Sequence, residues 1–241
     1  VSKINDLTLP TLNMYGSYCD LYKHPEQIRS PLIDTDITVY NKKDYCNQQC
    51  GGCPHRKISD DLIPILEEVE KLNHKYQNTS LELRSAIRHD IILDQQKLFR
   101  KIMQFTTRLK IAPEHISDKV LASMNKATRK EFELFLEEFK KVNEEQGTKK
   151  RLVPYFVAAH PATSMEEMEE LKKFCNQKGL FVNLTQVFTP TPGTASTATY
   201  YSGIETRTKK PVYVPRTWRE KKDQKNKLMS EERVDLSDDS G

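Results

Sequence analysis

The chain has 241 residues, of which 37% are hydrophobic and 30% are charged, and its formal net charge is +4. This length and apolar content suffice for one large globular domain or one and a half, and the near balance of charge excludes a strong global attraction to nucleic acid or to an anionic membrane. No apolar run approaches the roughly 20 residues that span a bilayer, and no signal segment opens the chain, so we expect a cytoplasmic protein without membrane contact.

The first half of the chain alternates short apolar strands with amphipathic helices. Val1 to Asn13 has the pattern of a strand end and the loop after it. Leu62 and Leu66 begin a helical apolar repeat, and Pro64 falls in the first turn, where its missing N–H costs little. The expected elements are a helix over 60–76, a strand over 81–87, a helix from about 92 to 104 and a strand over 109–112.

The second half continues the alternation. A helix with one aromatic face is expected to end at Gly147, and a capping box of Ser164 and Glu167 predicts the start of another helix, which ends before Gly179. Strands are expected over 153–158 and 182–188. The inward-facing positions of the two helices are Phe132, Phe135, Phe139 and Val142 in the first and Met168, Leu171 and Phe174 in the second.

Strands that alternate with helices imply right-handed crossovers and a parallel sheet, either open or curled into a full or partial barrel. In both arrangements ligands bind at the carboxyl ends of the strands. Polar and special residues follow the strands at five places, and we expect these loops to meet at one rim. The loops are residues 6–13, 88–90, 113–115, 160–163 and 189–194.

Five cysteines without a secretory signal favour metal binding or reactive thiols over a disulfide framework. Cys46, Cys50 and Cys53 form a C-x3-C-x2-C pattern with two glycines before its last member, and Cys19 precedes them. Four thiolates suit either a [4Fe–4S] cluster or tetrahedral zinc, while free loop thiols are the alternative. Cys175 differs, because it lies on an apolar helix face and is expected to be a buried structural residue.

Several segments form a series in the order of the expected strand ends. They read LKIAPEH at 109–115, PYFVAAHP at 154–161, FTPTP at 188–192 and ATYYSG at 198–203, with NMYG at 13–16, SAIRHD at 85–90 and CP at 53–54 as further landmarks. In order and spacing this series resembles the motifs of the YgiQ-type radical S-adenosylmethionine (SAM) proteins. The similarity covers roughly residues 4–215.

The resemblance implies an α/β fold, a partial (β/α)6 radical SAM barrel of the TIM-barrel kind, in which residues 1–205 supply strands two to six and about 17–58 form a cysteine-bearing insertion. It implies SAM and a [4Fe–4S] cluster as cofactors, an electron donor as a partner, 5′-deoxyadenosyl radical chemistry and an unknown substrate. The family's catalytic cysteines follow strand one, which would precede Val1. We therefore expect an upstream N-terminus and no turnover by this chain alone.

Under this resemblance the cysteine pattern at 46–53 is an auxiliary metal site completed by Cys19, with the catalytic cluster as the rival interpretation. Thr8-Leu9 replaces the family's Gly-Gly, which weakens the match to the segment that holds the methionine amino group, although backbone carbonyls can still serve. The other strand-end residues are expected to contact SAM or substrate, against the alternative of ordinary loop hydrogen bonds. The predicted cofactor-binding residues are Thr8, Asn13, Arg88, Glu114, His160 and Thr189.

Residues 206–241 are expected to form a basic and then acidic extension, partly disordered at its acidic end. Basic and aromatic residues alternate around Tyr213 and Trp218, a composition that nucleic-acid-binding segments share, but a solvated helix is the commoner explanation, and nucleic acid is not the expected partner. A function of a different class stays open. The chain could be a non-catalytic module that binds zinc, or a partner, on a barrel scaffold.

Overall fold

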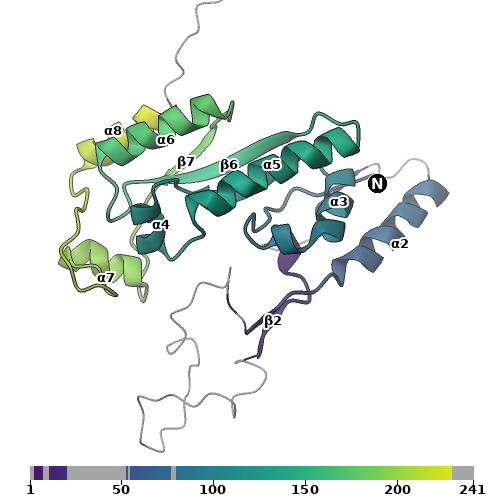
Figure 1. Ribbon diagram of the computed structural model, residues 1–241, viewed down its shortest axis with the longest axis horizontal. Coiled ribbons are helices and arrows are strands. Elements are labelled where there is room, and N and C mark those ends of the chain that lie inside the picture. Colours follow the sequence, from purple (N-terminus) through teal and green to yellow (C-terminus); the bar gives the residue numbers. More distant parts are fainter. Residues whose placement is uncertain (1–2, 8–10, 21–52, 54, 77–79, 230–241) are drawn as a thin grey trace, which may run out of the picture. The chain divides into compact units, whose positions relative to one another are not determined.

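The computed structural model describes residues 3–7, 11–20, 53, 55–76 and 80–229 (Figure 1). The chain divides into two compact units. The first unit contains Val1–Pro113 and Asn125–Leu152, and the second contains Glu114–Met124 and Val153–Gly241. No helix in the described ranges is long and apolar enough to cross a membrane.

The first unit combines short strand pairs with helices. Strand β1 pairs in parallel with β4, β2 pairs antiparallel with β3, and Ile87 forms an isolated parallel bridge to Ile111 of β5. Helices α2 and α3 pack side by side. The elements are β1 (Lys3–Asn5), η1 (Leu12–Met14), β2 (Tyr18–Cys19), β3 (Arg56–Lys57), α2 (Leu62–Lys75), β4 (Ser80–Glu82), η4 (Ile92–Asp94), α3 (Gln96–Gln104), β5 (Arg108–Glu114) and α5 (Arg129–Glu145).

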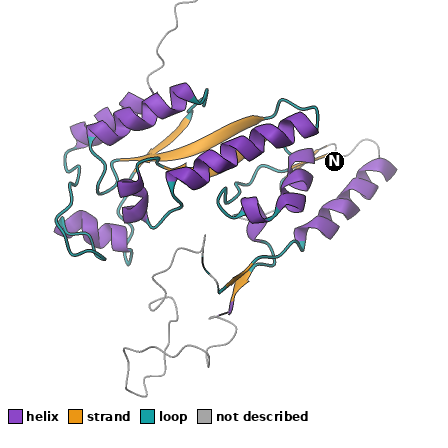
Figure 2. Ribbon diagram, viewed as in Figure 1, coloured by secondary structure: helices purple, strands orange, loops and turns teal. Residues whose placement is uncertain are grey.

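The second unit is built around a parallel pair of strands. Strand β6 pairs with β7 in parallel, from Tyr155 opposite Leu184 to Ala158 opposite Val187. Helix α8 packs on both α6 and β7, and α6 and α8 lie side by side (Figures 1 and 2). The elements are α4 (Asp118–Met124), β6 (Arg151–Ala158), α6 (Met165–Gln177), β7 (Leu184–Val187), α7 (Ala195–Ser202) and α8 (Trp218–Met229).

Each unit buries its own apolar cluster. In the first unit Phe99 and Phe135 lie 5.7 Å apart between ring centroids, and Phe132 is also fully buried. In the second unit the inward face of α6 and Phe156 of β6 are buried. Burying one such large side chain contributes roughly 1.5–3 kcal/mol, so these faces decide how the helices lie on their strands. The predicted structural role of Cys175 is confirmed, because it is 2% exposed and burial raises the pKa of its thiol to about 12.

The helix boundaries follow from capping chemistry. The predicted capping box of Ser164 and Glu167 is present at the start of α6, and Thr128 with Glu131 forms a second one at the start of α5. Gly147 and Gly179 adopt φ values of +61° and +62° just beyond α5 and α6. Only glycine takes this left-handed conformation at little cost, so each helix stops where the sequence predicted.

The predicted α/β class is confirmed, but the described strands form small sheets of two or three strands and no closed barrel. The strand expected over 81–87 is shorter than predicted and ends at Glu82. The backbone leaves the strand there because the Leu83 N–H donates to the Phe105 carbonyl, and only Ile87 regains a parallel bridge. Helices α4 and α7 were not predicted. The domain boundary at residue 205 stays a prediction.

Candidate functional site

Asn13 holds the loop that follows β4. Its side chain is fully buried, its Oδ1 accepts from the Arg88 backbone N–H at 2.8 Å, and its Nδ2 donates to the Arg88 carbonyl and to Gln95 Oε1, both at 3.1 Å. Gln95 in turn donates to the Ser59 carbonyl at 2.8 Å. Because both amide protons of Asn13 are used inside the protein, its side chain positions the backbone of Arg88.

Arg88 forms a two-pronged ion pair with Asp90, which the sequence had not singled out. Nε of Arg88 donates to Asp90 Oδ1 at 2.8 Å, and a second guanidinium nitrogen donates to Oδ2. Burial by itself would raise the pKa of the Asp90 carboxyl, but the hydrogen bonds and charge of Arg88 outweigh it and lower that pKa. The intervening His89 is a core residue, with its ring edge-on to Phe132 at 5.4 Å. The 88–90 loop therefore presents a paired cation, not an isolated one.

Glu114 ends β5 in an unusual backbone conformation. Its φ is +68°, in the left-handed region that a residue with a side chain seldom adopts. It is half-buried, and burial together with the nearby Glu114 charge raises the pKa of Tyr155 on β6. A residue held in a sparsely populated region persists where the surrounding fold requires it, and such residues gather at binding and catalytic sites.

His115 and His160 are both buried and neutral. Nδ1 of His160 lies 2.7 Å from the Pro161 carbonyl and Nε2 lies 2.8 Å from the Ser196 hydroxyl. A carbonyl only accepts, so Nδ1 carries the proton and Nε2 accepts from Ser196. Burial is the main cause that lowers the pKa of each imidazole to about 4. For His160 the ordinary alternative fits: the ring ties its own loop to α7.

Gln224 of α8 clamps the loop that contains His160, a role that no local sequence pattern indicates. Its Oε1 accepts from the Ala159 N–H and its Nε2 donates to the Thr163 carbonyl, both at 2.8 Å, and the side chain is 1% exposed. Ala159 and Ala162 have φ values of +62° and +75°. The hydrogen bonds of Gln224 therefore hold a loop in which two alanines adopt the left-handed conformation. Helix α8 thus holds a strained strand-end loop in place.

Thr189, a predicted cofactor-binding residue, follows β7 in the 189–194 loop. It is exposed, and its hydroxyl lies 3.4 Å from the Val187 carbonyl. It lines a groove of about 550 Å³ between β7 and α8. The residues that line this groove are Thr185, Gln186, Val187, Phe188, Thr189, Pro190, Trp218, Lys221 and Lys225.

Two of the four predicted metal ligands lie in the described part of the chain. Cys19 on β2 stands opposite Arg56 on β3, and the Arg56 N–H donates to the Cys53 carbonyl at 3.1 Å. Cys19 therefore lies on the strand pair and Cys53 lies in the turn just before β3, and both are half-buried. Cys46, Cys50 and the predicted cofactor residue Thr8 lie outside the described residues. Among the described residues no cluster of three or more metal-binding side chains occurs.

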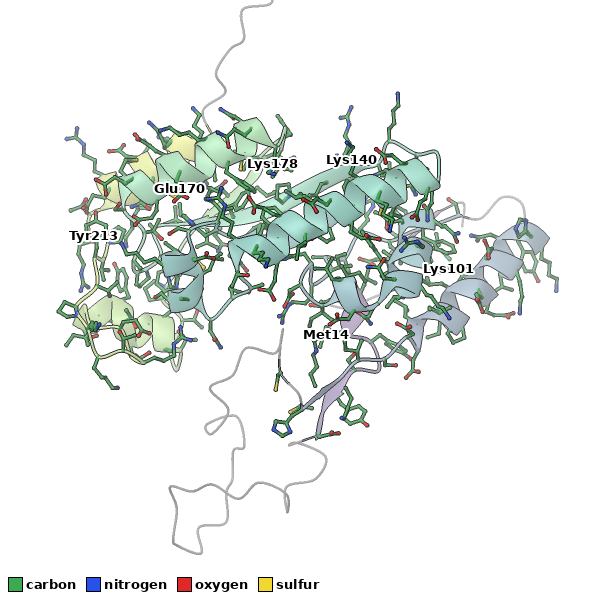
Figure 3. All side chains as sticks on the ribbon, in the orientation of Figure 1. Met14, Lys101, Lys140, Glu170, Lys178 and Tyr213 are labelled. Atoms are coloured by element: carbon green, nitrogen blue, oxygen red, sulfur yellow. The ribbon has the colours of Figure 1, made fainter. Side chains whose placement is uncertain are left out.

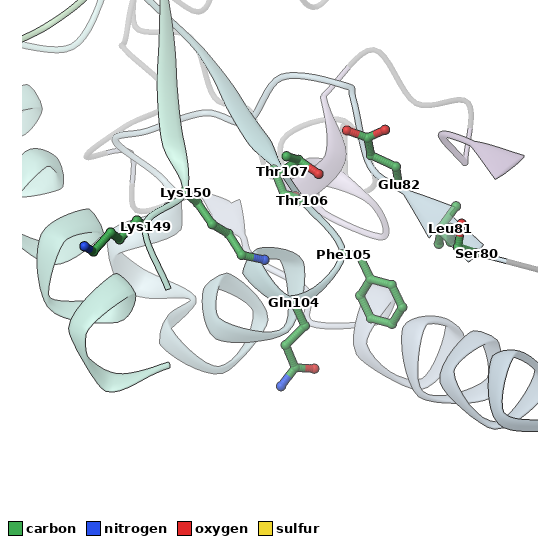
Figure 4. Close-up of a pocket in the computed structure, with 9 residues that line it drawn as sticks. All are labelled: Ser80, Leu81, Glu82, Gln104, Phe105, Thr106, Thr107, Lys149 and Lys150. Carbon is green, nitrogen blue, oxygen red and sulfur yellow. The ribbon is translucent and has the colours of Figure 1, made fainter. Parts of the chain in front are cut away.

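A second hollow, of about 430 Å³, lies at the other end of the strands of the first unit (Figure 4). It is lined by β4 and by the residues just before β5 and β6, which are the amino-terminal ends of these strands. Lys150 reaches the Met103 carbonyl there, and burial lowers the pKa of its ammonium group. In α/β proteins ligands bind at the carboxyl ends, so this hollow is a feature of packing.

These features define an α/β protein with short parallel strands whose strand-end loops are held by buried polar side chains. No family model matches the chain. The chain is 33% identical over 233 residues to a UPF0313 protein of Methanocaldococcus jannaschii. The matched region covers 92% of this chain and 35% of that protein. A UPF0313 protein of Geobacter sulfurreducens is 31% identical over 94% of this chain and 35% of its own length. A UPF0313 protein of Clostridium botulinum is 36% identical over 76% of this chain and 29% of its own length.

The chain belongs to the UPF0313 family, the family of the YgiQ-type proteins. The chain spans about a third of the length of the curated relatives it matches. The resemblance seen in the sequence motifs is therefore confirmed at the level of the family.

Proposed function

We propose that this chain is part of a radical SAM protein and that its strand-end loops contact SAM. Glu114 carries the proposal, because it is a half-buried carboxylate at the end of a strand and in a left-handed backbone conformation. A carboxylate in that position is a suitable acceptor for the hydroxyl or ammonium donors of SAM. Thr189, exposed beside the groove at the end of β7, is the second proposed contact.

The other candidates take supporting roles in this proposal. Asn13 positions the 88–90 loop, where the pairing with Asp90 fixes the Arg88 guanidinium. His160 and Gln224 hold the loop after β6. We also propose that the parallel strands belong to a partial (β/α)6 barrel; the parallel pairs β1–β4 and β6–β7 and the bridge from Ile87 to Ile111 support it.

The cysteine-bearing segment fits a thiolate-bound metal. Cys19 lies on β2 and Cys53 lies three residues before its partner strand β3, and the thiolate is the soft ligand that iron–sulfur clusters and structural zinc use. We propose that Cys19 and Cys53, with Cys46 and Cys50, hold an auxiliary [4Fe–4S] cluster. When bound, such a cluster supplies electron transfer, while the chain's residues provide the ligands and shield the site from water.

Equilibrium dialysis of the purified chain against radiolabelled SAM tests the proposed cosubstrate. Removing the Glu114 charge in Glu114→Gln should weaken SAM binding roughly 10- to 100-fold, because a hydrogen bond to a charged group contributes about 1.5–3 kcal/mol. Glu144→Gln on α5 is the matched control, since that carboxylate is 66% exposed in its side chain and should leave the affinity unchanged. A folded chain that binds no SAM, or binds it equally well as Glu114→Gln, contradicts the proposal.

A non-catalytic zinc or partner-binding role is the alternative function. The chemistry of Cys19 and Cys53 suits zinc as well as iron, so metal identity separates the two functions. SAM affinity separates them independently. The electron donor, the substrate and a cytoplasmic location remain part of the radical SAM proposal.

A further inference from the structure

The groove between β7 and α8 has a basic and aromatic wall. Trp218, Lys221 and Lys225 recur every three or four residues on α8, so they share one face of the helix, and all three line the groove. The neighbouring face of α8, with Gln224 and Leu228, is buried. Burial of Gln224 and Leu228 fixes the rotation of the helix and thereby directs the Trp218 face toward the groove.

Two tyrosine rings of α7 adjoin this wall through Lys221. Trp218 is 74% exposed and Tyr201 is 71% exposed, which leaves ring surface open to solvent on both. Tyr201 packs edge-on against Tyr200 at 5.3 Å, and Tyr200 in turn receives the Lys221 ammonium, 4.7 Å from its ring centroid, and the Arg216 guanidinium at 5.1 Å. Lys221 also donates to the Tyr200 hydroxyl at 2.7 Å. The exposed rings and the cations therefore form one continuous surface, which we call the α8 surface: Tyr200, Tyr201, Arg216, Trp218, Lys221 and Lys225.

The positive charge of the chain is concentrated around this surface. Residues 203–229 contain nine Lys and Arg against three Asp and Glu, a net charge of +6, whereas the whole chain has +4. All three carboxylates are engaged locally: Glu205 lies 3.5 Å from Arg207, Glu220 caps the start of α8 through Thr217, and Asp223 lies 3.8 Å from Arg219. Local pairing thus offsets little of the charge of Lys221 and Lys225.

We propose that the α8 surface binds single-stranded nucleic acid, with bases stacked on Trp218 and Tyr201 and the phosphates contacting Lys221, Lys225 and Arg216. Exposed aromatic rings beside cations in a groove are the combination that single-strand binding uses, because every base has a face that stacks and every nucleotide carries a phosphate. An acidic peptide would satisfy the cations but not the rings. This inference does not rest on SAM or metal binding.

Trp218 is the only tryptophan of the chain, so its fluorescence reports the site directly. Titration with a single-stranded DNA of about 12 nucleotides should quench the Trp218 emission, with a Kd on the order of 1–100 μM at low salt. Three phosphate contacts give a slope of log K against log salt of about −2, because each contributes roughly −0.7 on a single strand. The measurement needs neither SAM nor metal, so its failure is distinguishable from failure of the proposed function.

Variants separate stacking from charge. Trp218→Leu, followed by the anisotropy of a labelled strand, should weaken binding ~5- to 100-fold with little change in the salt slope. Lys221→Ala with Lys225→Ala should reduce the slope to about −0.7. Lys140→Ala with Lys141→Ala is the matched control on α5, where the Lys140 side chain is 80% exposed (Figure 3), and should change neither.

Three results would overturn the inference. They are no binding by a folded chain, equal binding of double-stranded DNA, and equal binding of poly-glutamate or heparin without quenching. The last two would mean that the surface recognises charge alone.

Discussion

Replacing Gln224 by alanine should lower the free energy of unfolding by about 3 kcal/mol. The change leaves the Ala159 N–H and the Thr163 carbonyl without the partners that hold them at 2.8 Å, in a site where the side chain is 1% exposed. Each buried backbone group left unsatisfied costs roughly 1–3 kcal/mol. Ala159 and Ala162, with positive φ, also lose the contact that keeps the loop closed. Urea unfolding followed by circular dichroism measures the change.

Two companion variants sharpen this test. Gln177→Ala removes an exposed glutamine at the end of α6. Its free energy of unfolding should stay within about 0.5 kcal/mol of the wild-type value. In Gln224→Glu only the protonated acid can donate to the Thr163 carbonyl, so folding should raise the glutamate pKa. The stability contributed by the protonated glutamate is then present below its unfolded pKa and lost as the pH rises. The difference in free energy of unfolding between Gln224→Glu and the wild type should therefore narrow as the pH falls from 7 to 5. A deficit that is equal at both pH values contradicts the clamp.

Lowering the pH from 7 to 5 should destabilise the wild-type chain by about 5–6 kcal/mol. Burial lowers the pKa of His89, His115 and His160 to about 4, against 6.5 for the free imidazole. The unfolded chain therefore binds more protons between these values, and the stability of the neutral native state is present above pH 6.5 and lost as pH falls toward 4. Each histidine contributes about 2 kcal/mol between pH 7 and pH 5.

The titration of the carboxylates contributes little to the change in stability between pH 7 and pH 5. For Glu167, burial raises the pKa but the hydrogen bonds and charge of its neighbours outweigh it, and for Glu220 hydrogen bonds with Thr217 are the main cause, so both pKa values fall to about 2. The stability that these carboxylates contribute is therefore lost only below the pKa of a free carboxylate. Urea unfolding at pH 7, 6 and 5 gives the slope, and His160→Gln should reduce the loss by about a third. His74→Gln, on the exposed side of α2, should not change it. Proton resonances of His89, His115 and His160 that titrate near 6.5 in the folded chain would contradict the expectation.

Helices with a clear apolar period and a cap were predictable from the sequence. The Ser164 capping box, the stop at Gly147 and the apolar face of α6 each rest on contacts within a few residues, and all occur in the structure. Leu72 shows the limit of the pattern, because it fits the period of α2 and is nevertheless 45% exposed. Helical period alone does not say which turns meet another element.

Short strands and the supporting residues of the site were not predictable. The apolar positions Leu83 and Ile87 predicted a strand through residue 87, but the Leu83 N–H donates to the Phe105 carbonyl and the ladder with β1 ends at Glu82. Gln224 is 61 residues away from Thr163, and Asn13 is 75 residues away from Arg88, so no local pattern connects either pair. The positions of the strand-end loops could be predicted from the sequence. The side chains that support these loops depend on the distant contacts described above and could not.

Metal analysis of the chain, purified and reconstituted without oxygen, tests the proposed iron–sulfur function most directly. We expect about four irons per chain and broad absorption near 400 nm, because thiolate-bound iron gives that spectrum. Both should be lost in Cys19→Ala with Cys53→Ala, whereas Cys175→Ala should keep them, since Cys175 is buried on α6. A colourless chain with one zinc, or with no metal in either form, would contradict the radical SAM account of this segment.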